Sequence, residues 1–290
     1  MNESPSVHEE VSRAYTRAVL SSPGEKRCCG SAIPKGVVAK SAGYGAEDLA
    51  VLPEDAVVNS FGCGNPLGFA GVREGEVVLD LGCGAGIDLL LAARKVGSQG
   101  KVIGVDMTQV MVEKARANVA KAGVTNVDVR EGIIEHLPVD DASVDWVISN
   151  CVINLSPDKP AVFAEIARVL KPGGRMRVSD IVAEDLPEVV RKDPALYSSC
   201  VAGAISEEQY LQGLRDAGLV DVEVRERIMY SADQLEAFAC SELPLEKAQP
   251  AEQTSCCGGA ASWMPGIDVA SLARGLEGRV WSARVAAKKP

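Results

Sequence analysis

The chain has 290 residues, enough to bury one substantial hydrophobic core with a smaller appended region. Its formal net charge of −10 argues against a nucleic-acid or anionic-membrane partner, because such partners require a dominant basic patch. No run of about eighteen apolar residues could span a bilayer, and the N-terminus has no signal peptide, so we expect a cytoplasmic protein.

The first half of the chain begins with a predicted amphipathic helix, because apolar residues recur at helical spacing from Val7 to Leu20. The segment from Ser31 to Gly45 has little periodicity, and we expect a mobile loop there. Two short helices should follow, one over Ala46–Val51 and one that starts near Pro53.

From Glu76 onward, strands and helices alternate, which is typical of a parallel sheet covered on both faces. Gly123 suits a helix C-terminus, and Pro172 with two glycines should end another helix. The expected strands are Val77–Leu81, Lys101–Val105, Val127–Arg130, Val144–Ile148 and Arg175–Ser179. The expected helices are Ile87–Val96, Gln109–Ala122 and Ala161–Leu170.

Beyond Ile181 the alternation weakens. A polar helical region should reach Cys200, and Ser206 is a plausible cap for a further helix. Val220–Arg227 and Ile228–Tyr230 have the pattern of two paired strands. From about Leu245 the composition is rich in Gln, Glu, Ala and Pro, so we expect low order there.

A glycine-rich loop follows the first strand of this pattern. Asp80 ends the strand, and Gly82, Gly84 and Gly86 then allow positive φ angles and a close approach of backbone to ligand. Asp106 lies about twenty residues further on, where a carboxylate can accept hydrogen bonds from both hydroxyls of a ribose. The loop therefore indicates an adenine nucleoside, although G-x-G-x-G differs from the dinucleotide fingerprint and an ordinary tight turn is the alternative.

These residues, together with Leu137-Pro138, Asp145 and Leu170-Lys171-Pro172-Gly173-Gly174, resemble the motifs of class I S-adenosylmethionine-dependent methyltransferases. The resemblance covers about residues 70–180. It implies an α/β fold, a Rossmann-like seven-stranded mixed sheet with one antiparallel strand and an N-terminal cap. It also implies a cofactor across the strand ends, bound by Asp80, Gly82, Gly84, Gly86, Asp106, Met107, Gly132, Ile133 and Asn150.

The adenine end departs from that pattern. Many members have an Asp after the glycine, whereas this chain has Ile133, so the backbone or Glu131 should read the adenine. Glu135 and His136 could both be solvated loop residues, and for His136 we prefer that interpretation.

Nine cysteines are unusual in such a chain. Their odd number and irregular spacing make a disulfide framework unexpected, and no paired CxxC motif suggests zinc. Taken singly, each could be a buried, inert small hydrophobe, which is our interpretation of Cys83 and Cys240. Reduced cysteines could otherwise bind a soft ion.

Three cysteine segments together resemble the arsenite methyltransferases: Asn59–Pro66, Ile148–Leu155 and Cys200–Ala204. The likeness extends from the first helix to about Phe238 and implies that Cys63, Cys151 and Cys200 bind arsenite(III) as thiolates. The lone pair of the bound arsenic would then attack the methyl group of S-adenosylmethionine, giving mono- and dimethylated products for detoxification. Cys28-Cys29 and Cys256-Cys257 also resemble pairs of this family.

Methylation formally oxidises arsenic, so the resemblance also implies an external thiol reductant such as thioredoxin or glutathione. Cys28 or Cys29 is the candidate for a redox role, with Cys63 as its partner. The Cys256-Cys257 pair could capture arsenic or have no role. We expect a monomer that binds arsenite and methylated arsenicals, and neither nucleic acid nor membrane.

Two alternatives stay open at this point. One is a methyltransferase for a small organic acceptor, with incidental cysteines. The other is a thiol-rich protein that binds metalloids without turnover. For the arsenite methyltransferase, the expected regions are a cysteine-bearing cap (1–69), a cofactor-binding domain (70–182), an arsenic-binding, sheet-completing region (183–244) and a mobile tail (245–290).

Overall fold

The computed structural model describes residues 6–20, 43–192, 197, 200–235 and 269–290, and the statements below concern these residues. Cys28, Cys29, Cys240, Cys256 and Cys257 lie outside the described residues, as does most of the loop expected at 31–45. No helix in the described ranges is both long and apolar enough to cross a membrane.

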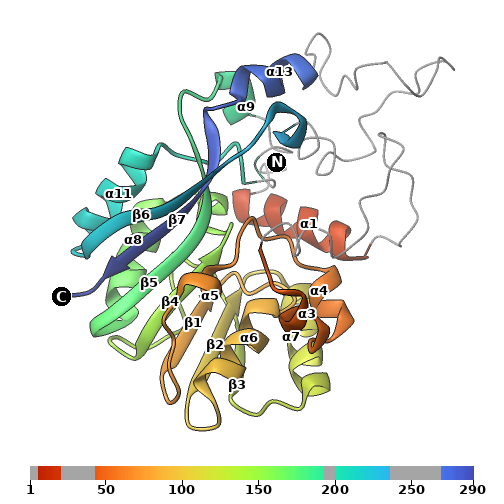
Figure 1. Ribbon diagram of the computed structural model, residues 1–290, viewed down its shortest axis with the longest axis vertical. Coiled ribbons are helices and arrows are strands. Elements are labelled where there is room, and N and C mark those ends of the chain that lie inside the picture. The colour runs from red at the N-terminus through yellow and green to blue at the C-terminus, as the bar shows by residue number, and fades with distance from the viewer. Residues whose placement is uncertain (1–5, 21–42, 193–196, 198–199, 236–268) are drawn as a thin grey trace, which may run out of the picture.

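One seven-stranded sheet forms the centre of the molecule, with the strand order β3-β2-β1-β4-β5-β7-β6 (Figure 1). The first five strands are parallel, and β7 is antiparallel to both β5 and β6. The expected mixed sheet with one antiparallel strand is therefore confirmed. The strands are β1 (Val77–Leu81), β2 (Lys101–Asp106), β3 (Val127–Glu131), β4 (Val144–Asn150), β5 (Leu170–Ala183), β6 (Val220–Met229) and β7 (Val280–Lys288).

The helices start and end close to the positions that their capping residues predict. Gly123 ends α7 in the left-handed conformation, and Ser206 forms a capping box with Gln209 at the start of α11. Asp158 accepts from the Ala161 amide, which starts α8 two residues before the expected position. The helices are α1 (Val7–Leu20), α3 (Ala46–Ala50), α4 (Glu54–Val58), α5 (Pro66–Phe69), α6 (Ile87–Val96), α7 (Gln109–Ala122), η1 (Ile153–Leu155), α8 (Lys159–Val169), α9 (Glu188–Arg191), α11 (Glu207–Asp216) and α13 (Val269–Leu276).

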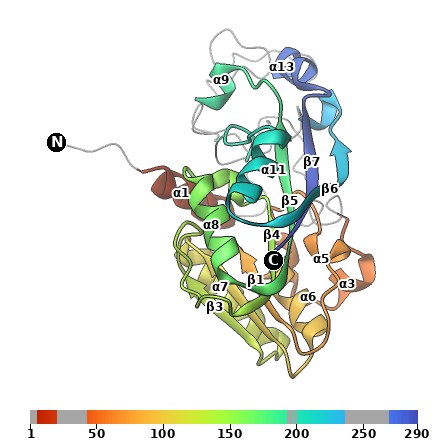
Figure 2. The same cartoon turned by 90° about the vertical axis from the view of Figure 1, so that its left-hand side faces the viewer.

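Successive residues of β1 enter different cores, because side chains alternate across a strand. Leu79 and Leu81 pack with residues of α8 and α11 on one face of the sheet, whereas Val78 packs with residues of α6 and α7 on the other. A third apolar cluster joins Val11 of α1 to residues of α9, α13 and the start of β7. Figure 2 shows α9 and α13 together at the end of the molecule away from β3.

The C-terminal third differs from the expectation in two ways. Val220–Met229 is one strand that pairs with β7, so the predicted local pairing of Val220–Arg227 with Ile228–Tyr230 is wrong. The expected mobile tail is also wrong for its last part, because Val280–Lys288 forms an inner strand between β5 and β6. Most of β7 is buried, and pairing on both sides satisfies its backbone groups.

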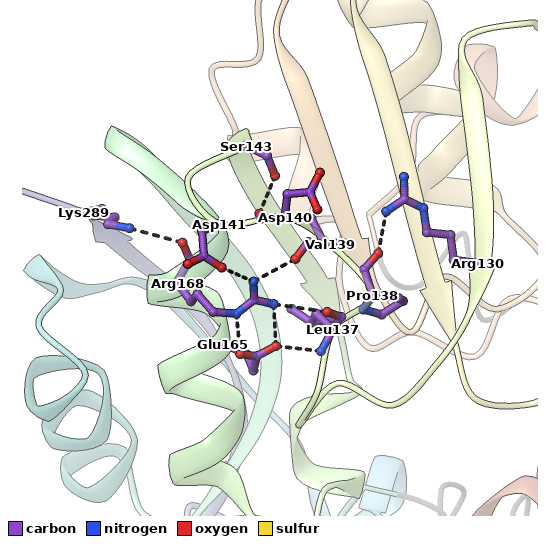
Figure 3. A network of polar contacts seen from close by, with 10 residues as sticks. All are labelled: Arg130, Leu137, Pro138, Val139, Asp140, Asp141, Ser143, Glu165, Arg168 and Lys289. Carbon is purple, nitrogen blue, oxygen red and sulfur yellow. Dashed lines mark hydrogen bonds and ion pairs between the residues drawn. The ribbon is translucent and has the colours of Figure 1, made fainter.

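Arg168 of α8 holds the loop that follows β3 (Figure 3). Its guanidinium donates to the carbonyls of Leu137 and Val139 and to the carboxylates of Glu165 and Asp141. Glu165 in turn accepts from the Leu137 amide at 2.7 Å. Hydrogen bonding from Arg168 lowers the pKa of Glu165. The network fixes the loop from Leu137 to Asp141, and Gly132, Ile134 and Glu135 just before it line the pocket described below.

We expect Arg168→Ala to lower the free energy of unfolding by about 2 kcal/mol, because several charge-assisted hydrogen bonds are lost together. Urea unfolding measures this change. Arg225→Ala is the control, since Arg225 and Glu223 form an exposed pair whose loss should cost about 0–1 kcal/mol. Equal losses in the two variants would contradict a special role of the Arg168 network.

Candidate functional site

A pocket lies where β1, β2 and β4 end, beneath α1, and contains about 890 Å³ of empty space including its mouth. The volume lies in the range of small-molecule sites. Helix α1 contributes His8, Val11 and Tyr15 to its wall. The predicted cofactor residues that line it are Asp80, Gly82, Gly84, Asp106, Met107, Gly132 and Asn150.

The glycine loop adopts the backbone conformation that the sequence predicts. Gly82, Gly84 and Gly86 have φ angles of 63°, 51° and 93°, a region that side chains with a Cβ rarely adopt. A Cβ on Gly82 would lie 2.2 Å from Val152 Cγ2, so this glycine is also required by packing. Gly86 caps α6 and does not itself line the pocket.

Asp106 is buried at the end of β2. Its two carboxylate oxygens accept from the amides of Gly84 (2.9 Å) and Thr108 (2.8 Å), which connects the loop to the second strand. Burial raises the pKa of Asp106, and these hydrogen bonds oppose the rise by stabilising the ionised form. Each oxygen retains a lone pair that can accept from a ligand in the pocket.

The loop after β3 departs from the expectation. Ile133 is 37% exposed and does not line the pocket, whereas Ile134 does. Ile134 is buried and occupies the position in the pocket wall that the sequence prediction gave to Ile133. Glu131 is exposed and also lies outside the pocket wall.

Glu135, interpreted above as a possible solvated residue, lines the pocket instead. Its Oε1 accepts from Ser156 Oγ and lies 2.9 Å from His8 Nε2, so it connects α1 to the pocket wall. His136 is exposed. No local pattern distinguishes Glu135 from His136, because the long-range contact to His8 decides which of them is enclosed.

Asn150, at the end of β4, connects the glycine-loop side of the pocket to the Cys63 segment. Its amide nitrogen donates to the Gly64 carbonyl (2.6 Å) and to Tyr44 Oη (2.9 Å), and its oxygen accepts from the Gly64 amide (3.0 Å). Tyr44 Oη donates to Asp88 Oδ2 at 2.8 Å. Sequence reasoning missed Tyr44 and Asp88, although a carboxylate among the apolar residues at the start of α6 was a usable signal.

The three predicted acceptor cysteines lie together at one end of the pocket. Cys63 and Cys151 form a disulfide with a Cα–Cα distance of 5.8 Å, and Cys200 Sγ donates to the Cys151 carbonyl at 2.7 Å. Cys151 also lines the pocket. On the far side, Ser282 of β7 lies near Cys63, with Oγ 3.8 Å from its Sγ.

The disulfide corrects the expectation that the thiols are reduced, and it pairs Cys63 with Cys151 rather than with Cys28 or Cys29. The two cysteines are 88 residues apart in sequence, so spacing could not indicate their proximity. In this oxidised state, the described part of the chain contains no group of three His, Cys, Asp or Glu side chains placed to hold a metal ion.

Cys151 and Cys200 share an uncommon backbone conformation. Their φ angles are 58° and 64°, in the left-handed region where residues with a Cβ are strained. Such strain often occurs at functional sites, where the surrounding structure enforces it. The Cys151 amide donates to the Ser179 carbonyl at 2.8 Å, which holds the turn after β4 against β5.

Comparison with known proteins gives a consistent result. A family model described as a methyltransferase domain matches residues 73–218. The chain is 51% identical over 183 residues to an arsenite methyltransferase of Halobacterium salinarum, covering 63% of this chain and 46% of the relative. It is 35% identical over 226 residues to an arsenite methyltransferase of Aquipseudomonas alcaligenes, covering 74% and 62%.

Among solved structures, the chain resembles an arsenic (III) S-adenosylmethionine methyltransferase from Chlamydomonas reinhardtii. The TM-score is 0.58 and the sequence identity 31%, and the match covers 89% of this chain and 74% of that one. The matched part of the chain spans only 46% of the length of the Halobacterium relative and 62% of the length of the Aquipseudomonas relative.

Proposed function

Because the chain belongs to the methyltransferase domain family and, within it, to the arsenite methyltransferases, we propose that it methylates trivalent arsenic. The methyl donor of this family is S-adenosylmethionine. The proposal rests above all on one observation: Cys63, Cys151 and Cys200 adjoin one another at the end of the pocket that the glycine loop lines.

The pocket residues fit the donor. Asp80 Oδ2 is buried without a hydrogen-bond partner among the described residues, and a Cβ at Gly84 would meet nothing within 4 Å, so the wall offers both an acceptor and space. Asp80 and the glycine loop would hold the amino-acid end, Asp106 the ribose, and Met107 and Gly132 the adenine. When bound, the donor supplies an electrophilic sulfonium methyl group.

Two glycines of the loop should respond differently to replacement by alanine. Gly82→Ala should lower the free energy of unfolding by about 2–4 kcal/mol, because it combines a strained φ with a clash against Val152. Gly84→Ala should cost only about 1–2 kcal/mol in stability, from the backbone alone, but should weaken binding of S-adenosylhomocysteine. Urea unfolding and calorimetric titration measure the two effects, and equal stability losses would contradict the clash.

The three cysteines would bind arsenite as thiolates once the Cys63–Cys151 disulfide is reduced. Arsenic(III) is soft and thiophilic, and thiolates are the side chains that suit it best. Their exchange for its hydroxyls releases water and leaves a pyramidal centre with a lone pair. No general base is then required to activate the acceptor, which suits a chain with only two histidines.

Methyl transfer requires the arsenic lone pair in line with the carbon–sulfur bond of the donor. The thiol-bound arsenic would form its bond to the methyl carbon as the carbon–sulfur bond breaks, and the electron pair of that bond would stay on the sulfur of S-adenosylhomocysteine, the leaving group. Arsenic is thereby formally oxidised by two electrons. Two thiols return it to the trivalent state and become a disulfide, and the observed pairing of Cys63 with Cys151 is compatible with that product.

Repeated turnover then needs an external thiol reductant, such as thioredoxin or glutathione. In this proposal residues 70–182 bind the donor and supply Cys151, while the cap (1–69) supplies Cys63 and the region from 183 onward supplies Cys200. The region from 183 onward includes β7, which brings Ser282 next to Cys63.

The decisive experiment incubates the reduced protein with methyl-labelled S-adenosylmethionine, arsenite and a thiol reductant. Label should appear in mono- and dimethylated arsenic, in step with S-adenosylhomocysteine. Tight arsenite binding without S-adenosylhomocysteine would instead identify a metalloid-binding protein. Turnover of an organic acceptor that persists after Cys63→Ser and Cys200→Ser would identify a different methyltransferase.

A further inference from the structure

A half-buried lysine begins α8, beside the turn that carries Cys200. Lys159 Nζ donates to the carbonyl oxygens of Asn154 (3.4 Å) and Ser156 (3.1 Å), both in the segment after β4. Within the described ranges these are the hydrogen bonds of the ammonium group, and neither acceptor is a carboxylate. The dipole of a helix opposes a cation in its first turn, and burial lowers the pKa of Lys159. The position is therefore unfavourable for a lysine unless an anion lies nearby.

The two carbonyls that hold the ammonium group also contact the turn around Cys200. The Ser156 carbonyl accepts from Tyr197 Oη at 3.2 Å, and a Cβ on Gly203 would lie only 2.1 Å from the Asn154 carbonyl oxygen. Tyr197 and Gly203 lie on either side of Cys200 in the sequence, and the Cys200 amide donates to the Tyr197 carbonyl. The backbone after β4 thus holds the lysine and the cysteine turn against each other.

The charges around Lys159 come from several elements. Burial lowers its pKa most, and three groups that can be anionic oppose this effect: Asp180 of β5, then Cys200, then Glu135. Arg191 of α9 acts in the same direction as burial, because two like charges repel. The Cys200 sulfur is therefore within electrostatic range of the ammonium group and acts on it more strongly than the Glu135 carboxylate does.

Both carboxylates of this set have other partners. Glu135 bonds the His8 ring of α1, and Asp180 accepts from Asn154 and from the next backbone amide. Burial raises the pKa of Asp180 to about 7, so at neutral pH this carboxyl carries only part of a negative charge. Neither carboxylate fully balances the buried cation, and a thiolate at Cys200 would complete the balance.

We propose that Lys159 is a positioning residue for arsenite capture, which presents a positive charge to the thiolate of Cys200. The proposal deepens the proposed function and rests on the acceptor site assigned there. Three thiolates in one cluster repel one another, and a cation beside the cluster lowers that cost. Bond formation to arsenic then cancels the negative charge on sulfur. The charge of Lys159 should therefore assist capture of arsenite and have little effect on methyl transfer.

Arsenite binding in the absence of donor measures capture directly. The protein is reduced with a phosphine, so that no added thiol competes for arsenite. Calorimetric titration should show about 10-fold weaker arsenite binding by Lys159→Met, which keeps the length of the side chain and removes its charge. Lys159→Arg keeps the charge and should stay within about threefold of the unaltered protein.

Lys171→Met is the matched control, because Lys171 pairs with Asp145 just beyond the other end of α8. Its arsenite affinity should equal that of the unaltered protein. All three variants should bind S-adenosylhomocysteine within about twofold of the unaltered protein, which also shows that they are folded.

Steady-state kinetics supplies a readout that a purely structural role would not give. Lys159→Met should raise KM for arsenite about 10-fold and leave kcat within about twofold, because the charge acts before the arsenic–sulfur bonds form. A displaced Cys200 would instead lower kcat, since the arsenic lone pair would lose its alignment with the donor.

Three outcomes would overturn the proposal: equal losses of arsenite affinity in Lys159→Met and Lys159→Arg, an unchanged affinity in Lys159→Met, or a lower kcat with an unchanged KM. Arsenite binding without any methylated product in the unaltered protein would overturn the proposed function instead. The comparison of arsenite affinities among the Lys159 variants would then still decide whether this residue assists capture.

Discussion

Replacing Cys151 by serine should abolish the formation of methylated arsenic while leaving S-adenosylhomocysteine binding within about twofold of the parent. Cys151 lies at the pocket wall, is joined to Cys63 and accepts from Cys200 through its carbonyl, so it is central to the proposed acceptor site. A serine hydroxyl is nearly isosteric but hard, and it cannot replace a thiolate toward trivalent arsenic. Labelled-methyl transfer and calorimetry measure the two properties.

The matched control is Cys83→Ala, which removes a buried thiol from the glycine loop, outside the acceptor cluster. Arsenite binding by this variant, measured without cofactor, should be unchanged. Cys63→Ser and Cys200→Ser should, like Cys151→Ser, lose the formation of methylated arsenic and keep S-adenosylhomocysteine binding. If the Cys151→Ser variant formed methylated arsenic at the rate of the unaltered protein, the three-thiolate mechanism would be rejected, although the protein would still be an arsenite methyltransferase.

Asp106→Ala should weaken binding of S-adenosylhomocysteine about 10- to 100-fold, from the loss of charge-assisted hydrogen bonds to the ribose. The same change leaves the amides of Gly84 and Thr108 without their acceptor, so the glycine loop loses its connection to β2. The loss of the ribose hydrogen bonds and the loosening of the glycine loop should both weaken binding of S-adenosylhomocysteine. Calorimetric titration gives the affinity, and thermal unfolding shows how much of the change is structural.

Glu131→Ala is the control for Asp106. Glu131 pairs opposite Asp106 in the sheet but is exposed and does not line the pocket. The affinity of the Glu131→Ala variant for S-adenosylhomocysteine should therefore match that of the unaltered protein. An unchanged affinity in Asp106→Ala would remove Asp106 from the binding site, and a loss in Glu131→Ala would restore Glu131 as a candidate reader of the adenine.

The donor half of the molecule could be predicted well because its signals are local. Strands β1 and β2 are short and mostly apolar, and α6 and α7 begin and end at residues with clear capping or glycine preferences. Asp80 and Asp106 lie in the C-terminal ends of β1 and β2, which are parallel neighbours, so strand order alone brings them to one edge of the sheet.

The acceptor half depends on contacts between distant residues, which no local pattern encodes. The Gln-, Glu-, Ala- and Pro-rich composition from about Leu245 suggested a mobile tail, yet Val280–Lys288 pairs along β5 and β6. Glu135 lines the pocket, against the expectation, and its side chain contacts His8, more than a hundred residues earlier in the chain. The disulfide of Cys63 with Cys151 depends in the same way on tertiary proximity.

The position of β7 also imposes an order on biosynthesis. Residues 280–288 leave the ribosome after β5 and β6 but must insert between them. Until then the nascent chain presents two open sheet edges, which favour aggregation. The strands up to β5 are complete by residue 183, when the part of the wall that Ser282 forms beside Cys63 is still missing. Nascent chains stalled before residue 280 should therefore depend most on chaperones.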